Sequence, residues 1–312
     1  METTFEHQSV LLNEVISLMA PKSGGIYCDG TLGGGGHAEQ ILEKSSPDGQ
    51  LIGIDQDLNA IAAARKRLAR FGGRAQIFHG RFSQLDELLR QAHVPKLDGL
   101  LLDLGVSSHQ LDEASRGFSF MNAGPLDMRM DASAGESAKE LLARISEDEL
   151  ADIIFKFGEE RMARKVARSI KQMELAGTLE TTGDLAVAVK RVVGQKRPGK
   201  SDPATKTFQA IRIAVNDEMN ELESVLKMLP EPLAIGGCVA IITFHSLEDR
   251  MVKERFNELV NPCQCPPGMP VCTCPKPYAE FASRRSVRVS KHEIESNRRA
   301  RSAKVRAIRR VR

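Results

Sequence analysis

The segment from Asp29 to His37 reads Asp-Gly-Thr-Leu-Gly-Gly-Gly-Gly-His and lies between an apolar run and a helical pattern. Glycines let a backbone approach a ligand closely and adopt positive φ, and the following helix N-terminus offers N–H groups to it. Asp55 ends the next apolar run, where an acid commonly accepts hydrogen bonds from ribose hydroxyls. A flexible turn beside a solvated acid is the alternative. The order strand, glycines, helix, strand, acid favours a nucleotide-type pocket.

The spacing of the glycines restricts which nucleotide-type ligand this pocket would bind. They follow neither G-x-G-x-x-G, typical of dinucleotide sites, nor G-x-x-x-x-G-K-[ST], typical of triphosphate sites. S-adenosylmethionine has no phosphate, but has an adenosine, an amino-acid end and a sulfonium. Phe82, after the third apolar run, could form the adenine wall or pack in the core. Asp103, which ends the fourth run, could stand near the methyl group.

The elements that would position these residues are short apolar runs that alternate with helical patterns. The runs are Ile26–Asp29, Leu51–Asp55, Ala75–His79, Leu97–Asp103 and Cys238–Phe244, and the helical patterns are Ala38–Lys44, Leu58–Phe71 and Phe82–Ala92. This alternation predicts an α/β fold, with a Rossmann-like, doubly wound and mostly parallel sheet. Ligands of such sheets bind outside the carboxyl ends of the strands, where the strand order reverses.

One connection between strands is much too long for a crossover, because 134 residues separate Asp103 from Cys238. A single apolar stripe predicts one crossover helix over 207–229. We therefore expect a discontinuous domain made of 1–110 and 204–312, interrupted by an inserted helical domain at 111–203. Within the insertion, four cations on a helical pattern could track phosphates or form a solvated face. They are Arg161, Arg164, Lys165 and Arg168.

Composition and charge narrow the class of protein. The chain has 312 residues, 41% of them hydrophobic and 27% charged, which excludes disorder throughout. No signal peptide and no membrane-spanning run is recognisable, so we expect a cytoplasmic protein. Residues 284–312 carry a net charge of +10, whereas the rest carries −7. Such a basic tail suggests a polyanionic partner, most plausibly nucleic acid, although a solvated tail is the alternative.

Long motifs, in order along the chain, resemble the bacterial 16S ribosomal RNA (cytosine-N4)-methyltransferase family. They are His7-Gln-Ser-Val-Leu-Leu12, Asp29 to His37, Leu101-Leu-Asp-Leu-Gly-Val-Ser-Ser108, Arg116-Gly-Phe-Ser-Phe120, Gly124-Pro-Leu-Asp-Met-Arg-Met-Asp131, Thr207-Phe-Gln-Ala-Ile-Arg212 and Phe244-His-Ser-Leu-Glu-Asp-Arg250. A weaker match follows at Arg299-Ala-Arg-Ser302.

The resemblance implies a class I methyltransferase domain interrupted by a helical domain. It implies that the chain methylates N4 of cytidine 1402 near the decoding centre, with S-adenosylmethionine as the methyl donor. The partner would be 16S rRNA in the small subunit or a late assembly intermediate, without a membrane, and whether the chain forms a homodimer is left open. By motif match the cofactor contacts would be Gly35, Gly36, His37, Asp55, Phe82, Asp103 and Gln110.

The exocyclic amine of cytosine is a poor nucleophile because its lone pair is delocalised into the ring. A carboxylate or carbonyl that accepts its hydrogen bond would localise this lone pair. Asp103 is the candidate catalytic residue, although it could instead only hold the cofactor. Related amino-methyltransferases place an Asp/Asn-Pro-Pro-aromatic motif here, which this chain lacks.

Five residues are candidate substrate contacts on segments expected to face the same cleft. Phe118 and Phe120 could stack on an unstacked cytosine or pack as a hinge between domains. Asp127, Arg129 and His245 lie in matching motifs, although a lone histidine is more often structural.

The chain has six cysteines, four of them in a C-x-C-x6-C-x-C pattern. Cys263, Cys265, Cys272 and Cys274 could together bind zinc, but zinc pairs usually leave two to four residues between cysteines. The family resemblance implies no metal, and we expect none.

Two other functions stay open at this point. One is an RNA-binding ribosome assembly factor with a vestigial cofactor pocket. The other is a DNA amino-methyltransferase, for which the missing Asp/Asn-Pro-Pro motif would be usual.

Overall fold

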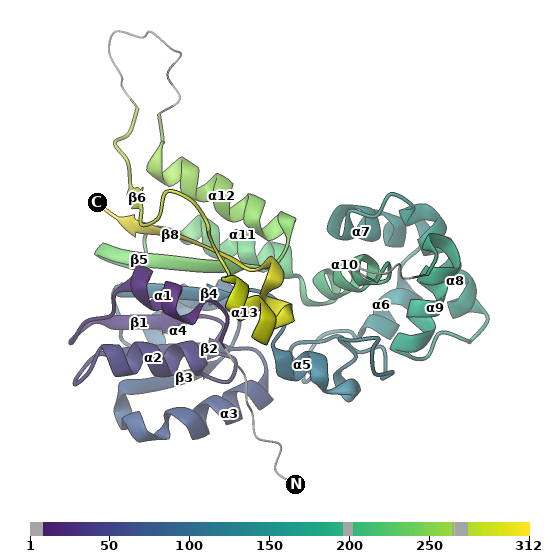
Figure 1. Cartoon of the computed structure of the whole chain (residues 1–312), viewed down its shortest axis with the longest axis horizontal. Coiled ribbons are helices and arrows are strands. Elements are labelled where there is room, and N and C mark those ends of the chain that lie inside the picture. The colour runs from purple at the N-terminus through teal and green to yellow at the C-terminus, as the bar shows by residue number, and fades with distance from the viewer. Residues whose placement is uncertain (1–8, 196–201, 264, 266–273) are drawn as a thin grey trace. The chain divides into compact units, whose positions relative to one another are not determined.

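The computed structural model describes residues 9–195, 202–263, 265 and 274–312. The chain folds into two compact units, of which the first comprises Met1–Gly105 and Asn220–Arg312 and the second comprises Val106–Met219 (Figure 1).

Among the described residues, eight strands of the first unit form one sheet in the order β3-β2-β1-β4-β5-β8-β6, with β7 paired to β8. The first five strands are parallel to one another, and β8 runs antiparallel to β5, β6 and β7. The bounds are β1 (Ile26–Asp29), β2 (Gln50–Asp55), β3 (Ala75–His79), β4 (Leu97–Asp103), β5 (Leu233–Thr243), β6 (Ala279–Phe281), β7 (Val287–Arg288) and β8 (Lys304–Arg310).

This mostly parallel, Rossmann-like sheet confirms the predicted fold class. Each of the five predicted apolar runs is a strand, although β5 begins five residues earlier than expected, at Leu233, and ends at Thr243. The predicted helices are present as α2 (Gly36–Lys44), α3 (Leu58–Leu68) and α4 (Leu85–Gln91).

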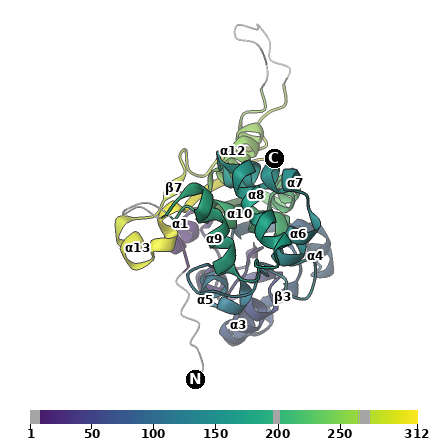
Figure 2. The same ribbon diagram turned by 90° about the vertical axis from the view of Figure 1, so that its right-hand side faces the viewer.

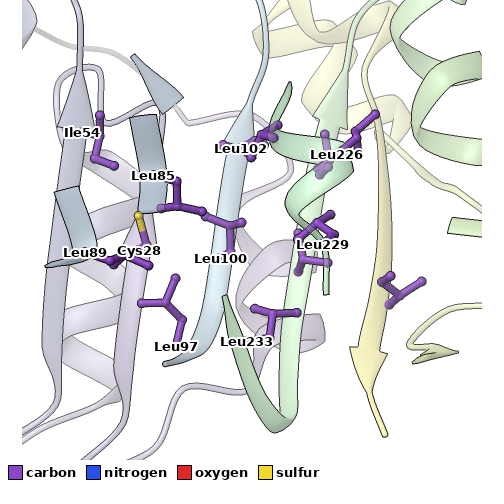
Figure 3. Packing of buried hydrophobic residues seen from close by; sticks show 14 of the residues in the cluster. Cys28, Ile54, Leu85, Leu89, Leu97, Leu100, Leu102, Leu226, Leu229 and Leu233 are labelled. Atoms are coloured by element: carbon purple, nitrogen blue, oxygen red, sulfur yellow. The ribbon is translucent and has the colours of Figure 1, made fainter. Parts of the chain in front are cut away.

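Helices cover both faces of the sheet because the strands are apolar on both sides. Alternate residues of β4 point to opposite faces, so that Leu100 and Leu102 join one core cluster and Leu101 joins another. Figure 3 shows Leu100 and Leu102 beside Leu85 and Leu226 in the first of these clusters. That cluster packs against α4, α11 (Glu218–Met228) and α12 (Ser246–Val260), and the other packs against α1 (Leu12–Met19), α2 and α3.

The second unit is helical, and its helices pack around one hydrophobic core. Its bounds are α5 (Ser108–Asp112), α6 (Ala138–Arg144), α7 (Glu147–Gly158), α8 (Ala163–Leu175), α9 (Thr182–Val193) and α10 (Thr205–Asn216). α7 packs against both α8 and α10, and α8 packs against α9 (Figure 2). Capping boxes such as Ser146 with Glu149 begin several of these helices by accepting their first N–H groups.

The prediction of a single helix over 207–229 is wrong, because the structure has two helices there. Asp217 has a φ of 55°, a left-handed conformation that ends α10 at Asn216 before α11 begins at Glu218. α10 belongs to the second unit, so this unit extends to Met219, beyond the expected end of the insertion at residue 203.

The basic segment over 284–312 is not a tail, because its last strand is built into the sheet. β8 lies between β5 and β6, and its Val305 and Ile308 are fully buried. Lys304 and Arg306 of this strand both form ion pairs with Asp249, at 3.0 and 2.7 Å. Part of the positive charge of this segment is therefore paired with an acid of the same unit. Two short helices, α13 (Lys291–Ser296) and a 3-10 helix over 298–302, precede β8.

Throughout the part of the chain that the structure describes, every helix is too short or too polar to span a lipid bilayer.

Candidate active site

Three carboxylates gather at the carboxyl ends of adjacent parallel strands. Asp29, Asp55 and Asp103 end β1, β2 and β4, and we call them the acid cluster. The chain continues from β1 to β2 on one side and from β4 to β5 on the other, so the strand order reverses between β1 and β4. Ligands of such sheets bind at this position.

The glycine turn between β1 and α2 lies beside the acid cluster. Gly33 and Gly35 have φ values of 51° and 79°, a conformation that side chains rarely adopt. A Cβ on Gly33 would meet nothing closer than 3.9 Å, so the turn has open space above it. Gly36 is the first residue of α2, and a glycine is needed there for a different reason. A Cβ at this position would lie 2.1 Å from the Ser9 hydroxyl oxygen.

The N-cap residue of α2 is Gly35, which has no side chain to accept the first N–H groups of the helix. The first N–H groups of a helix have no partner within the helix, and its N-terminal end carries a partial positive charge. The glycine turn therefore presents backbone donors, as the sequence predicted for a nucleotide-type ligand.

Asp55 is tied to the glycine turn through its carboxylate. Its Oδ2 accepts a hydrogen bond from the Gly33 N–H at 2.7 Å, and its Oδ1 accepts one from the Asp57 N–H at 2.8 Å. Each carboxylate oxygen can accept a further hydrogen bond. Burial raises the pKa of Asp55 to about 6, against these two N–H groups, which lower it. This carboxylate can accept hydroxyl donors, and does so better above about pH 6.

Asp29 was not predicted as a site residue, yet it is the most buried member of the acid cluster, with 1% of its surface exposed. Burial raises its pKa to about 7, with the nearby Asp55 charge adding to the effect and the Thr31 N–H opposing it. Its place at the end of β1, next to β4, is the sequence signal that could have identified it.

Asp103 carries the least satisfied polar atom of the cluster. Its Oδ1 is buried and has no hydrogen-bond partner among the described residues. Its backbone N–H donates to the Thr31 hydroxyl at 2.6 Å, which fixes the end of β4 against the turn. Burial, together with the charges of Asp29 and Glu248, raises the pKa of Asp103 well above its usual value. A buried oxygen without a partner is costly, which points to a ligand that donates to it.

His37 lies between the turn and Asp103. Its Nε2 is 3.0 Å from the Val10 carbonyl oxygen, which accepts a hydrogen bond if Nε2 carries the proton. Nδ1 then faces Asp103 Oδ2 at 3.9 Å. His37 is buried, so its direct contact with a cofactor stays a prediction, whereas its position beside Asp103 is observed.

His245 and Glu248 form the N-terminal cap of α12 at the end of β5. Glu248 Oε2 accepts from the backbone N–H groups of Phe244 and His245 at 2.8 and 3.2 Å, and only 1% of this residue is exposed. His245 Nδ1 accepts from the Glu248 N–H at 3.4 Å, and its Nε2 lies 3.0 Å from Glu248 Oε1. The structure therefore gives His245 a capping role, and its predicted substrate contact stays untested.

Glu248 is a second residue that sequence reasoning missed. An acid three residues after a cap position is the signature of a capping box, and this signal was present in Phe244 to Arg250. Its charge matters for the site because it raises the pKa of Asp103.

Phe82 lies just after β3, at the same edge of the sheet, and is partly buried against the core cluster of α4. A Cβ on Gly30 would lie 3.3 Å from the Phe82 Cβ. Both predicted roles, adenine wall and core packing, fit this position.

Of the predicted contacts in the second unit, Gln110 and Phe118 have structural roles. Gln110 caps α5, because its Oε1 accepts the Ser107 N–H at 2.9 Å. Phe118 is buried in the helical core, which favours packing over base stacking. Phe120 is partly exposed and packs edge-to-face on Phe208, with ring centroids 4.8 Å apart.

Asp127 and Arg129 pair with each other through two parallel contacts, Nε to Oδ1 at 2.9 Å and Nη2 to Oδ2 at 2.7 Å. Burial raises the pKa of Asp127, but hydrogen bonds from Arg129 outweigh it and hold this pKa below its usual value. Asn216 anchors the same loop by accepting the Met130 N–H at 2.7 Å and donating to the Met128 carbonyl at 2.8 Å. Asp127 and Arg129 therefore lie in a loop that is held by their own ion pair and by Asn216.

The four predicted phosphate-tracking cations are all exposed, at or on α8. These cations are Arg161, Arg164, Lys165 and Arg168. Arg168 pairs with Glu147 at 3.0 Å. Both predicted roles, phosphate tracking and a solvated helix face, fit this exposed position.

Comparison with known proteins gives matches over nearly the whole chain. Residues 4–311 match the MraW methylase family. The ribosomal RNA small subunit methyltransferase H of Trichlorobacter lovleyi is 52% identical over 305 residues, 97% of each chain. Proteins of the same name from a Geobacter species and from Sorangium cellulosum are 48% and 50% identical, over 98% of this chain and 99% and 91% of theirs.

Proposed function

Because the chain belongs to the MraW methylase family, we propose that it transfers a methyl group from S-adenosylmethionine to small-subunit ribosomal RNA. The acceptor is the exocyclic N4 of a cytidine, at position 1402 by the resemblance described above, and the activity is cytoplasmic, where the subunit is assembled. The observation that carries the proposal is the buried Oδ1 of Asp103, which has no partner within the described part of the chain and lies beside a glycine turn and two further carboxylates.

The residues at this edge fit S-adenosylmethionine in shape and in charge. Gly33 leaves open space over the turn, and Asp55 retains lone pairs for ribose hydroxyls. Three carboxyl groups whose pKa values are all raised suit a cationic ligand, because a nearby positive charge stabilises their ionised forms. Phe82 is the proposed adenine wall. When bound, the cofactor supplies an electrophilic methyl group on its sulfonium.

Asp55 and the glycine turn act together as a positioning device. The Gly33 N–H holds one carboxylate oxygen of Asp55 in place, so ribose donors would meet an acceptor of fixed orientation. Fixing the donor and the amine in line removes much of the entropic cost of a bimolecular transfer. Gly35, Gly36, His37 and Gln110 are the other proposed cofactor contacts.

Asp103 is the proposed acceptor for the cytosine amine. An ionised Oδ1 would accept a hydrogen bond from N4, and this bond localises the nitrogen lone pair. As the new N–C bond forms, the carboxylate would receive the proton that leaves N4. The backbone is fixed on either side of this carboxylate, because the Asp103 N–H donates to the Thr31 hydroxyl and the Leu104 N–H donates to the Ile242 carbonyl. A buried, low-dielectric position strengthens this interaction compared with water.

Binding of RNA is proposed to rest on exposed cations of both units, since phosphate contacts supply most of the affinity for nucleic acids. Arg164 and Arg168 on α8 are examples in the second unit, and Arg284 and Arg285 in the first. Phe120, Asp127, Arg129 and His245 stay proposed substrate contacts.

The test is methyl incorporation from labelled S-adenosylmethionine into small subunits, naked 16S rRNA and duplex DNA, with the modified nucleoside identified by mass spectrometry. We expect N4-methylcytidine, with assembled or nearly assembled subunits as the best substrate. Asp103→Asn should abolish most of the labelling. Asp98→Asn, at the amino end of the same strand, is the matched control and should leave it unchanged.

Two results would contradict the proposal. Equal labelling of duplex DNA would favour a DNA amino-methyltransferase. Binding to subunits without detectable cofactor binding would favour an assembly factor with a vestigial pocket.

A further inference from the structure

Three cysteines in the first unit bring their sulfur atoms together. The Sγ atoms of Cys263, Cys265 and Cys274 all lie within 4.8 Å of one another. Cys263 is exposed and the other two are half-buried. These residues take no part in the acid cluster, and the proposed function makes no use of them. The fourth cysteine of the predicted C-x-C-x6-C-x-C pattern, Cys272, lies outside the described residues.

The spacing of the sulfurs suits a shared metal ion. Zinc–sulfur bonds of about 2.3 Å in a tetrahedron place neighbouring sulfurs about 3.8 Å apart. Cys265 and Cys274 are 3.4 Å apart, far longer than the roughly 2.05 Å bond of a disulfide. Thiolates select zinc over magnesium or calcium, which prefer oxygen ligands.

The position of the cysteines explains what a metal would stabilise. They lie in the connection between α12, which ends at Val260, and β6, which begins at Ala279 (Figure 1). The two ends of this connection are already close, since the Tyr278 N–H donates to the Leu259 carbonyl at 2.9 Å. The described residues between them form no helix or strand. A metal would therefore supply cross-links that neither a backbone ladder nor an apolar core supplies here.

The same position separates this cluster from the chemistry. α12 has fifteen residues, begins beside the acid cluster and ends near the cysteines. At 1.5 Å per residue its length is about 22 Å. A metal at the far end of this helix contacts neither the cofactor nor the base, so its role is structural.

We propose that Cys263, Cys265 and Cys274 bind one structural zinc ion. Each thiol loses its proton on binding, and a fourth ligand completes the tetrahedron. This reverses the expectation of no metal, which rested on the family resemblance and on the single residue between the paired cysteines. One intervening residue is compatible with a shared ion because a third sulfur arrives from the other end of the connection.

The experiment measures zinc in untagged, full-length protein that is expressed with added zinc and dialysed against metal-free buffer. We expect about one zinc per chain by elemental mass spectrometry. Cys265→Ser and Cys274→Ser should each lose most of it. Cys238→Ala, which removes a buried cysteine of β5, is the matched control and should keep its zinc.

A second measurement covers variants that fail to fold. Cobalt(II) exchanged into the wild-type protein should give the thiolate-to-metal charge-transfer bands and the intense visible bands of a tetrahedral thiolate site. Zinc below about half an equivalent in wild-type protein would overturn the proposal. So would full zinc retention in Cys265→Ser and Cys274→Ser, a cobalt spectrum without thiolate bands, or a Cys265–Cys274 disulfide in protein alkylated at lysis.

Discussion

Ionisation of Asp55 should make cofactor binding depend on pH. The pKa of this carboxyl is about 6 in the free protein, because burial outweighs the two N–H groups that it accepts. If ribose hydroxyls donate to the ionised form, binding favours loss of the proton. At pH 5 only about one molecule in eleven has Asp55 ionised, so this carboxyl group by itself should make the affinity roughly tenfold lower than at pH 8.

Ionisation of Asp55 strengthens cofactor binding, but it lowers the stability of the folded protein without cofactor. The pKa of this carboxyl is raised from 3.8 in the unfolded chain to about 6, so the folded state binds more protons between these values. Its contribution to stability is therefore full below pH 3.8 and is lost as the pH rises through about 6. This rise in pKa lowers the free energy of unfolding at pH 8 by about 3 kcal/mol when no cofactor is bound.

Asp55→Asn separates these effects. The amide cannot ionise, which removes the 3 kcal/mol cost, but its NH2 faces a backbone N–H and leaves one donor unpaired, at about 1–3 kcal/mol. The variant without cofactor should therefore be about as stable as wild type at pH 8. Its affinity for S-adenosylmethionine should fall by about 10- to 100-fold through loss of charge-assisted hydrogen bonds.

Calorimetric titration with S-adenosylmethionine at several pH values, in buffers of different ionisation enthalpy, measures both the affinity and the protons released. Below pH 6, wild type and the Asp98→Asn control should each release up to about one proton more on binding than Asp55→Asn does. An unchanged affinity or an unchanged pH dependence in Asp55→Asn would refute the assignment of Asp55 to the ribose.

Three further predictions concern the proton acceptor, the second unit and the RNA contacts. Asp103→Asn should lower kcat by about 10²- to 10⁴-fold, whereas the affinity for the cofactor should change much less. Single-turnover kinetics on small subunits would measure this, and equal losses in kcat and in affinity would make Asp103 a cofactor ligand only. Asn216→Ala leaves the Met130 N–H and the Met128 carbonyl unpaired, so urea denaturation should show a loss of about 2–3 kcal/mol in the second unit; a loss below about 0.5 kcal/mol would contradict the anchoring role. Arg164→Gln should reduce the salt dependence of subunit binding by about one counterion if this cation contacts phosphate, and an unchanged slope would indicate a solvated face.

The strands and their carboxyl ends could be predicted from the sequence because β1, β2 and β4 are mostly apolar and end in aspartates, whereas the edge strand β3 is shown by Ile77 and Phe78 before His79. Burial on both faces demands such runs, and parallel pairing brings their ends to one edge. The neighbourhood of Asp55 and Asp103 followed directly. Asp29 was equally accessible to this reasoning, since it ends the strand between them.

Features that depend on single backbone conformations or on distant pairing could not be predicted. The apolar stripe over 207–229 continues through Asp217, whose left-handed φ breaks the helix without changing the pattern. β8 was interpreted as part of a basic tail because four of its seven residues are Lys or Arg, and its place between β5 and β6 depends on pairing across the chain. By contrast, the capping boxes at Gln110 and His245 have their usual spacing in the sequence, but both residues were interpreted as ligand contacts on the family resemblance.

A crystal structure of the protein with bound S-adenosylmethionine, or with the demethylated product, tests the central claim most directly. We expect the ribose hydroxyls on Asp55, the adenosine beside the turn at Gly33, and the sulfur near Asp103. Adenosine bound elsewhere, or a ribose without contact to Asp55, would contradict the assignment of the acid cluster to methyl transfer.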